Sequence, residues 1–439
     1  MNRNTSINNQ LREKELLFNV NYPILKNATY KSLVNYSSDL NKKIQRWYRY
    51  KEGYSITLVE NILDNYKVTK EDIVLDPFVG SGSTIIEAKK RGCHAIGYEV
   101  NPFSYFLCKT KTQNYSKKDK DDFIKIINEV VNSYTKYKKF NEPKLSTTAK
   151  LFKKDILDYL LKIKTLLTEM NVTEKSRDLA KLVWLGILEE VSNYRKAGNG
   201  LKKRNTKKEN ELTLPLVKQI ILTKLNQILE DLDFAIEISK TSLKEPRIIM
   251  ASSLSMPQLK NNTIKGVIFS PPYANCFDYT EIYKMELWFG DFVLEYPDLK
   301  KLRSVAVRSH LNGYKNCTES KIKTLKYLED ILLELSKQQL WDKRIPEMIR
   351  AYFQDMFTSL EEIYRVLKKD GFCSIIVSNS AYAGIVIPTD LLLAEYAKNC
   401  GFKVKKIDVA RFIIPSSQQY TKTRSYKNFL RESIIFLEK

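Results

Sequence analysis

Residues 72–84 read DIVLDPFVGSGST, an apolar run followed by a turn with two glycines. The run predicts a buried strand, and a GxG turn after a strand brings backbone N–H groups close to a ligand, because glycine has no Cβ to block the approach. Residues 85–91 then have helical character, and residues 94–98 predict a second strand. The first strand ends at Asp76 and the second at Glu99, so we expect a strand, glycine turn, helix, strand unit with an acid after each strand.

The same alternation continues towards the carboxyl terminus. Strand-like runs lie at 247–250, 266–269, 372–377, 404–414 and 433–437, and an apolar stripe predicts a long helix over 345–367, ended by Lys369-Asp370-Gly371. Strands that alternate with helices indicate an α/β fold with a mostly parallel sheet. We expect the last two strands to lie close together.

Two stretches interrupt this alternation. Residues 111–245 read as lysine-rich amphipathic helices and predict a helical insertion, and residues 290–341 predict a second, smaller one. Residues 1–45 are polar and predict an N-terminal arm. The α/β domain would then consist of two halves, residues 46–110 and residues 246–439.

The charge of the chain points to a polyanionic partner. Among its 439 residues, 73 Lys and Arg stand against 51 Asp and Glu, a formal net charge of +22. Such an excess favours nucleic acid, although lysine-rich solvated faces would produce it as well. Residues 193–208 contain seven basic residues and no acid, and predict a phosphate-binding loop. The residues expected to contact nucleic-acid phosphates there are Arg195, Lys196, Lys202, Lys203 and Arg204, and the other two basic residues are Lys207 and Lys208.

Other classes of site are disfavoured by composition. The six cysteines form no CxxC pair and the only histidines are His94 and His310, so we expect no metal site and no disulfide framework. No apolar run is long enough for a membrane span, and the amino terminus lacks the pattern of a signal peptide. We expect a cytoplasmic protein.

A second motif, Ser270-Pro271-Pro272-Tyr273, closes the apolar run at 266–269. Proline supplies no N–H to a strand ladder, so the run should stop there and leave a hydroxyl, carbonyls and a ring at its carboxyl end. Ligands bind at that edge of open α/β sheets. A planar base with an exocyclic amine would suit these groups.

The acids after the first two strands predict the kind of cofactor. A third glycine of the NAD-binding pattern would stand where the chain has Ile85, and the GK[ST] of a phosphate loop is missing. Glu99 is placed to hold ribose hydroxyls, and Asp76 would face a cationic group. S-adenosylmethionine has both parts. Taken singly, each acid reads equally well as a loop carboxylate or a helix cap.

Together, the two motifs resemble motifs I and IV of the exocyclic-amino DNA methyltransferases, which methylate N4 of cytosine or N6 of adenine. DPFVGSGST is similar to the family's DPFxGSGT, with Ser83 in place of the terminal threonine and Thr84 following it, and SPPY matches [DNS]PP[YFW]. Residues 46–55 resemble motif X. The resemblance implies a class I methyltransferase fold, Rossmann-like, with a mostly parallel seven-stranded sheet and S-adenosylmethionine as cofactor.

The resemblance also implies site residues. Those implied at the cofactor are Tyr54, Ser55, Asp76, Pro77, Phe78, Gly80, Gly82, Thr84, Glu99 and Ser252, and the catalytic ones are Ser270, Pro271, Pro272 and Tyr273. Ser252 stands where the family usually has an acid or another polar group. In many family members DPFxGSGT follows the PPY motif, whereas here it precedes it. The target-recognition region therefore cannot be carried over, and residues 111–245 are its candidate.

The chemistry expected of the SPPY motif is orientation of an amine. Hydrogen bonds to the Ser270 hydroxyl and the Pro271 carbonyl would aim the amine lone pair at the methyl group, while Tyr273 stacks on a flipped base. No Pro-Cys dipeptide offers the nucleophile of C5-cytosine enzymes. Residues following the motif would shape the pocket or form an ordinary surface loop: Asn275, Phe277, Asp278 and Tyr279. Arg303, Arg308, Ser309, His310, Arg411 and Ser416-Ser417-Gln418-Gln419 are further polar candidates.

Serine at position 270 favours cytosine N4 over adenine N6, since a hydroxyl both donates and accepts. The rivals are an RNA methyltransferase, for example on guanine N2 of tRNA, a nucleic-acid-binding protein that retains the fold, and more distantly an oxidoreductase. The expected partner is double-stranded DNA, with a cognate restriction endonuclease if the protein belongs to a restriction-modification system. The sequence leaves the recognition site, the nuclease and the oligomeric state open.

Overall fold

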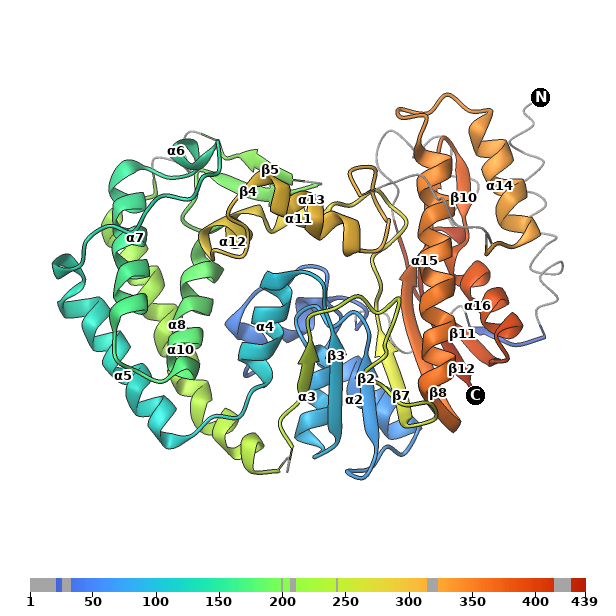
Figure 1. Ribbon diagram of the computed structural model, residues 1–439, viewed down its shortest axis with the longest axis horizontal. Helices are drawn as coiled ribbons and strands as arrows, with labels where there is room; N and C mark the ends of the chain where they lie inside the picture. Colours follow the sequence, from blue (N-terminus) through green and yellow to red (C-terminus); the bar gives the residue numbers. More distant parts are fainter. Residues whose placement is uncertain are drawn as a thin grey trace.

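A single sheet organises the molecule. The computed structural model describes residues 21–25, 33–198, 200–205, 211–241, 244–313, 323–413 and 428–439. Within these residues the main sheet has eight strands in the order β1-β11-β12-β8-β7-β2-β3-β6 (Figure 1). Neighbouring strands are parallel except at β12, which is antiparallel to β11 and to β8. The mostly parallel, Rossmann-like sheet of a class I methyltransferase is confirmed, with β1 as an added edge strand.

The strands lie close to the predicted positions. The strands of the main sheet are β1 (Ile24–Leu25), β2 (Ile73–Asp76), β3 (His94–Tyr98), β6 (Arg247–Ile249), β7 (Ile264–Phe269), β8 (Leu367–Ser378), β11 (Lys403–Phe412) and β12 (Arg431–Glu438). Two hairpins stand apart from it, β4 (Tyr194–Ala197) with β5 (Gly200–Lys203) and β9 (Ser380–Tyr382) with β10 (Ile385–Ile387). Lys369-Asp370-Gly371 lies inside β8 and does not separate helix from strand as expected, because the preceding helix already ends at Val366.

Helices cover both faces of the sheet. The helices of the α/β domain are α2 (Ile56–Asn65), α3 (Ser83–Lys90), α4 (Pro102–Thr112), α15 (Ile345–Val366) and α16 (Thr389–Asn399). Alternate residues of a strand point to opposite faces. Val74 and Ile268 accordingly join the core formed with α2 and α3, whereas Leu75 and Val267 join the core formed with α15 and α16. The sheet is therefore buried on both sides, as a parallel sheet requires.

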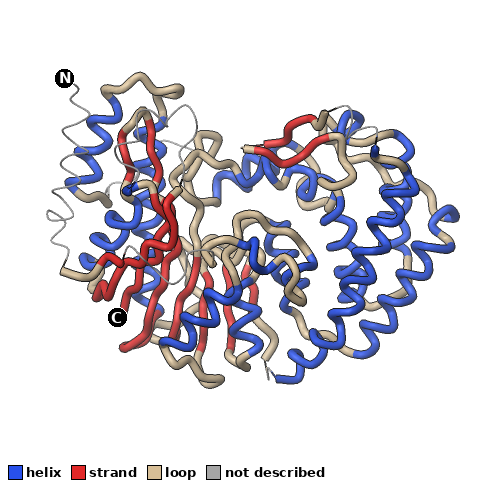
Figure 2. The backbone as a smooth tube through the Cα atoms, turned by 180° about the vertical axis from the view of Figure 1, so that it is seen from behind, coloured by secondary structure: helices blue, strands red, loops and turns tan. Residues whose placement is uncertain are grey.

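A helical region stands beside the α/β domain (Figures 1 and 2). Its helices are α5 (Lys117–Asn132), α6 (Thr148–Leu151), α7 (Lys154–Glu169), α8 (Glu174–Ile187) and α10 (Leu214–Thr241). These helices share one apolar core with α4. The two chain segments that join the region to the sheet lie side by side, since Asn114 N donates to Glu245 Oε1 at 2.6 Å and Tyr115 N donates to Ser239 Oγ at 2.9 Å.

The segment that resembles motif X is anchored on this helical region. Two short 3-10 turns lie at its start and before it, η2 (Gln45–Trp47) and η1 (Tyr36–Asp39), and a third, η3 (Tyr134–Lys136), follows α5. Asp231 of α10 is fully buried and accepts from Ile44 N, Arg46 Nε and Trp47 Nε1, each at 3.0 Å. The helical region is thus fastened to the chain next to the cofactor motifs.

The stretch after SPPY divides between two cores. It contains α11 (Tyr279–Ile282), α12 (Lys284–Phe289), α13 (Tyr296–Val305) and α14 (Lys326–Ser336). Leu299 and Leu302 of α13 pack into the core of the helical region, whereas Leu328 and Ile331 of α14 pack with α15. None of the described helices is long and apolar enough to cross a membrane.

Candidate active site

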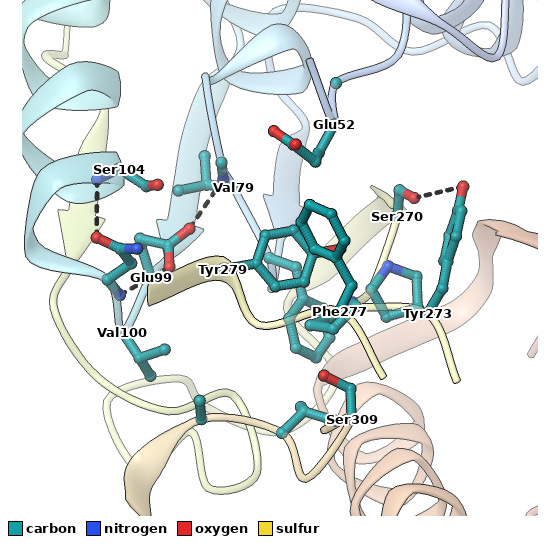
Figure 3. Close-up of a pocket in the computed structure, with 18 of the residues that line it drawn as sticks. Glu52, Val79, Glu99, Val100, Ser104, Ser270, Tyr273, Phe277, Tyr279 and Ser309 are labelled. Atoms are coloured by element: carbon teal, nitrogen blue, oxygen red, sulfur yellow. Dashed lines mark hydrogen bonds between the residues drawn. The ribbon is translucent and has the colours of Figure 1, made fainter. Parts of the chain in front are cut away.

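A cavity of about 320 Å³ opens at the carboxyl ends of β2, β3, β6 and β7. Its volume lies in the range of about 300–1,000 Å³ typical of small-molecule sites. Glu99 lies on one side of it and Ser270 and Tyr273 on the other, with the rings of Phe277 and Tyr279 between them in the view of Figure 3. The cavity therefore joins the two motifs that the sequence singled out.

The glycine turn forms one wall and requires its glycines. Gly80 and Gly82 have φ of +49° and +86°, a region that other residues rarely adopt. A Cβ on Gly82 would stand 2.9 Å from Cys108 Sγ, and one on Gly80 would stand 3.2 Å from the ring of Tyr50. Gly80 lines the cavity, whereas Gly82 lies behind it, where it begins α3.

Glu99 lies at the cavity wall, beside this turn, as predicted. Its Oε2 accepts from Gly80 N at 3.0 Å and its Oε1 accepts from Asn101 N at 2.8 Å (Figure 3). Burial raises the pKa of Glu99 to about 7. Each carboxylate oxygen has further lone pairs, so Glu99 can accept hydroxyl donors from a molecule in the cavity.

Asp76 occupies a different position from the one expected. It is fully buried and lies off the cavity wall, where Oδ2 accepts from Tyr54 OH at 2.8 Å and Oδ1 accepts from Phe78 N at 3.0 Å. Burial raises the pKa of Asp76 to about 7. The structure contradicts the expectation that Asp76 faces a cationic group in the cavity, because its carboxylate is fully buried and does not line the space. Asp76 holds the turn in place.

Two other predicted cofactor residues also lie off the wall. Thr84 is fully buried with its Oγ1 2.6 Å from Tyr54 OH, and it donates to the Ile268 carbonyl of β7 at 3.2 Å. Ser55 is fully buried and caps α2, where its Oγ accepts from Thr57 N at 3.2 Å. These residues support the wall and do not form it. The remaining predicted cofactor residues, Tyr54, Pro77, Phe78 and Ser252, line the cavity.

Another acid, Glu52, faces the cavity, and it was not among the residues predicted from the sequence. It lies in the stretch that resembles motif X, accepts from the Tyr283 hydroxyl, and has its pKa raised by burial. The acid stands two residues before Tyr54, which the sequence did select, so its place in the motif was the available signal. Glu52 and Glu99 are thus two separate acids that line the cavity.

The SPPY motif forms the other side. Ser270, Pro271, Pro272 and Tyr273, the residues predicted to be catalytic, all line the cavity. The Ser270 hydroxyl donates to Tyr273 OH at 3.3 Å, and Tyr273 OH donates to Glu432 Oε1 at 2.9 Å (Figure 3 draws the first of these). Glu432, at the start of β12, is a further cavity residue that the sequence did not reveal.

The loop after SPPY and the loop before residue 313 close the cavity. Asn275, Phe277, Asp278 and Tyr279 line it, and so do Ser309, His310 and Arg411. Asp278 accepts from Arg303 at 2.9 Å and from Asn312 Nδ2 at 3.0 Å. Arg303 does not line the cavity itself but holds Asp278, which does. Arg308 pairs with Asp355 of α15. Residues 416–419 lie outside the described residues.

The basic segment at 193–208 is a hairpin and not the loop that was expected. Strands β4 and β5 pair in antiparallel register with Arg195 opposite Lys202. Arg195, Lys202 and Lys203 are exposed. Lys207 and Lys208 lie outside the described residues.

Two of the predicted DNA contacts in this hairpin are structural. Lys196 is buried and its Nζ lies 2.6 Å from Glu286 Oε1 and 3.1 Å from Tyr48 OH. Arg204 donates to the carbonyls of Ser192 at 3.0 Å and Glu189 at 2.9 Å. The expectation of a phosphate contact is therefore wrong for Lys196, whose charge is already paired, and Arg204 binds the backbone beneath the hairpin.

The donor set of the cavity suits a nucleoside with a charged tail. Backbone N–H groups of a glycine turn, a carboxylate beside them and several aromatic rings surround the space. No cluster of three His, Cys, Asp or Glu side chains that could hold a metal ion occurs among the described residues.

Comparison with known proteins agrees with this chemistry. The family model of the N6/N4 methyltransferases, described as DNA methylase, matches residues 25–107. Type II methyltransferase M.BsoBI of Geobacillus stearothermophilus is 31% identical over 424 residues, which span 86% of this chain and 82% of that protein. M.AvaI of Nostoc sp. is 26% identical over 86% of this chain and 83% of the relative, and M.MvaI of Kocuria varians is 23% identical over 88% and 87%.

Among solved structures, geranyl diphosphate C-methyltransferase from Streptomyces coelicolor A3(2) aligns with a TM-score of 0.30 at 8% identity, over 100% of this chain and 98% of that one. The family follows from the sequence relatives, since the identity to M.BsoBI extends over most of both chains. This chain belongs to the type II DNA methyltransferases of the N6/N4 amino-methyltransferase family, which use S-adenosylmethionine as methyl donor.

Proposed function

We propose that this protein transfers a methyl group from S-adenosylmethionine to the exocyclic amine of a base flipped out of double-stranded DNA, with N4 of cytosine preferred. The observation that carries the proposal is a shared cavity, because Glu99 and the glycine turn line the same space as Ser270 and Pro271. A donor and an acceptor of the methyl group bound on its two sides would meet inside it.

The cofactor side would be held by acids and by the turn. Glu99 would accept the ribose hydroxyls, and the residues of the glycine turn would lie against the nucleoside. Glu52, rather than Asp76, is the acid proposed to face the amino group of the methionyl end, because Glu52 lines the cavity and Asp76 does not. When bound, the cofactor supplies an electrophilic methyl group on a positively charged sulfur.

The target side would orient the amine. The Ser270 hydroxyl oxygen and the Pro271 carbonyl would accept its two N–H groups, which favours a tetrahedral nitrogen with its lone pair directed at the methyl group. Tyr273 would stack on the flipped base, a contact worth roughly 1–3 kcal/mol. The nitrogen would then gain the methyl group, lose one proton to solvent, and leave a neutral sulfur on the cofactor.

Serine at position 270 supports cytosine N4 over adenine N6, because serine in place of aspartate at the first position of this motif favours cytosine N4 among the exocyclic-amino methyltransferases. Adenine N6 is the alternative, and the relatives do not separate the two. The rival proposal for the substrate is RNA in place of DNA.

For the DNA itself we propose the β4–β5 hairpin, with three exposed phosphate contacts, Arg195 and Lys202 opposite each other on one face and Lys203 on the other. The hairpin belongs to the helical region between residues 111 and 245, which we propose as the target-recognition region. The type II relatives suggest a partner endonuclease for this chain as well.

One experiment tests the whole proposal. Duplex DNA and total RNA are incubated separately with the protein and isotopically labelled S-adenosylmethionine, digested to nucleosides and examined by mass spectrometry. We expect labelled N4-methylcytosine from DNA alone. Labelled N6-methyladenine would select the alternative base, and label in RNA alone would overturn the assignment to DNA.

A further inference from the structure

Four side chains from three separate parts of the chain form a continuous row of hydrogen bonds that ends at Ser270. Arg411 of β11 pairs through its Nε with Glu432 of β12, Glu432 Oε1 accepts from Tyr273 OH at 2.9 Å, and Tyr273 OH accepts from Ser270 Oγ at 3.3 Å. We call these residues the Ser270 hydrogen-bond chain. All four line the cavity.

The topology of the sheet explains how Glu432 reaches this place. Strand β12 is antiparallel to β8, so its first residues lie at the edge where β7 and β8 end. Glu432 pairs in register with Ser378 near the end of β8 and with Arg411 near the end of β11. This puts a carboxylate beside the SPPY motif from 159 residues away in the sequence.

The direction of each hydrogen bond in the row is fixed by chemistry. A carboxylate can only accept, so the single proton of the Tyr273 hydroxyl goes to Glu432, whose other oxygen accepts from Arg411 Nε. Burial and the charge of Glu432 hold the pKa of Tyr273 well above its usual value, so the phenol keeps this proton. The Tyr273 oxygen is then left as an acceptor, and the single proton of Ser270 goes to it.

The consequence concerns the lone pairs of Ser270. A free serine hydroxyl donates and accepts and can rotate between the two, whereas a hydroxyl whose proton is committed to Tyr273 presents only acceptor sites to the cavity. We infer that Glu432, supported by Arg411, is a positioning residue that makes Ser270 a pure acceptor for the N–H of the target amine. The inference rests on the proposed amine methylation and assigns Tyr273 a second task besides stacking.

The first test removes only the Tyr273 hydroxyl. Full-length Tyr273→Phe keeps the ring and is assayed with labelled S-adenosylmethionine and genomic DNA from a methylation-deficient bacterial host. We expect kcat to fall about 10- to 100-fold, because the acceptor is no longer held in place, and KM for DNA to change less than about twofold, because stacking is retained. Tyr396→Phe is the matched control, since Tyr396 OH donates to Glu361 Oε1 at 2.6 Å outside the cavity. It should leave kcat unchanged.

The second test asks whether the hydroxyl acts through Ser270. In Ser270→Asp, residue 270 carries no proton to be directed, so adding Tyr273→Phe to that variant should change kcat less than about threefold. An equal fall in both backgrounds would overturn the inference, since the hydroxyl would then act by another route.

The third test rescues the acceptor at position 432. The amide oxygen of Glu432→Gln can still accept from Tyr273, whereas Glu432→Leu cannot, so we expect Glu432→Gln to retain kcat within about fivefold and Glu432→Leu to match Tyr273→Phe. Equal loss in both variants with melting temperatures unchanged would contradict the role as acceptor. Wild-type protein that methylates no DNA would overturn the proposed function together with the inference, whereas active wild type with undiminished Tyr273→Phe would overturn the inference alone.

Discussion

Glu99 and Glu432, which line different parts of the cavity, are held in different ways. Glu99 accepts from the backbone N–H groups of Gly80 and Asn101, whereas Glu432 accepts from the side chains of Tyr273 and Arg411. Backbone donors are fixed by the path of the chain, and side-chain donors disappear with one substitution. The position of Glu99 is therefore set by the turn, and the position of Glu432 depends on which side chains are present.

The largest effect should follow from removing the target side. The double substitution Ser270→Ala with Tyr273→Ala deletes the acceptor and the stacking ring, so we expect methyl transfer to fall at least about 1,000-fold. Calorimetry with S-adenosylhomocysteine should show affinity within about threefold of wild type. Loss of that affinity would mean that the two sides are not separate.

Glu99 should be the most sensitive point of the cofactor side. We expect Glu99→Ala to weaken binding of S-adenosylhomocysteine about 10- to 100-fold, because hydrogen bonds from the ribose to a charged acceptor are lost. Asp76→Asn is the matched control at the end of the neighbouring strand. Its amide oxygen can accept from Phe78 N while its amide N–H donates to Tyr54 OH, so affinity should stay within about threefold. A larger loss in Asp76→Asn than in Glu99→Ala would restore the role first predicted for Asp76.

Glu99 should also make the binding of S-adenosylhomocysteine depend on pH. Burial raises the pKa of Glu99 to about 7, so its carboxyl group is protonated below that pH and becomes a carboxylate above it. Because the carboxylate is the better acceptor, affinity for S-adenosylhomocysteine should rise through about pH 7, by up to about tenfold per unit on the acidic side. Titrations repeated with Glu99→Gln should be flat, and an unchanged slope would assign the titration to another group, with Asp76 the first candidate.

The smallest effect concerns the hairpin, where neighbouring basic residues should behave differently. Arg195→Ala with Lys202→Ala should lower the salt dependence of DNA binding by about 0.9 in log–log slope per residue. Lys196→Ala should leave that slope unchanged and instead reduce the free energy of unfolding by about 3–5 kcal/mol, because it strands the buried Glu286 carboxylate. Filter binding at several salt concentrations and urea unfolding measure the two. A reduced salt dependence of DNA binding in Lys196→Ala would instead indicate that Lys196 contacts DNA.

The cofactor side could be read from the sequence because its parts are close together along the chain. One continuous stretch supplies β2, the turn, α3 and β3 with Glu99, and local patterns are enough to predict it. Asp76 was misplaced because the sequence does not show which side of the turn a side chain occupies. Hydrogen bonds from the Tyr54 hydroxyl at 2.8 Å and from Phe78 N at 3.0 Å hold Asp76 off the cavity wall.

The target side was predicted only as far as the SPPY motif. Glu432 depends on the antiparallel register of β12 against β8, which no local pattern specifies. The prediction for the β4–β5 hairpin was wrong at Lys196 for a different reason. Composition treats its basic residues as alike, but adjacent residues of a strand point to opposite faces, so Arg195 and Lys196 cannot share one environment.

The side-by-side ends of the helical region have a consequence for how such enzymes diversify. Since Asn114 and Glu245 are hydrogen-bonded to each other, the chain enters and leaves the helical region at neighbouring points beside the sheet. A region of another length with the same end points can replace the helices without altering the strand order, because loop closure becomes only slowly less favourable with length. Because Asp231 of the same region also anchors Ile44, Arg46 and Trp47, a replacement must supply that anchor as well if the neighbouring cofactor motifs are to keep their place.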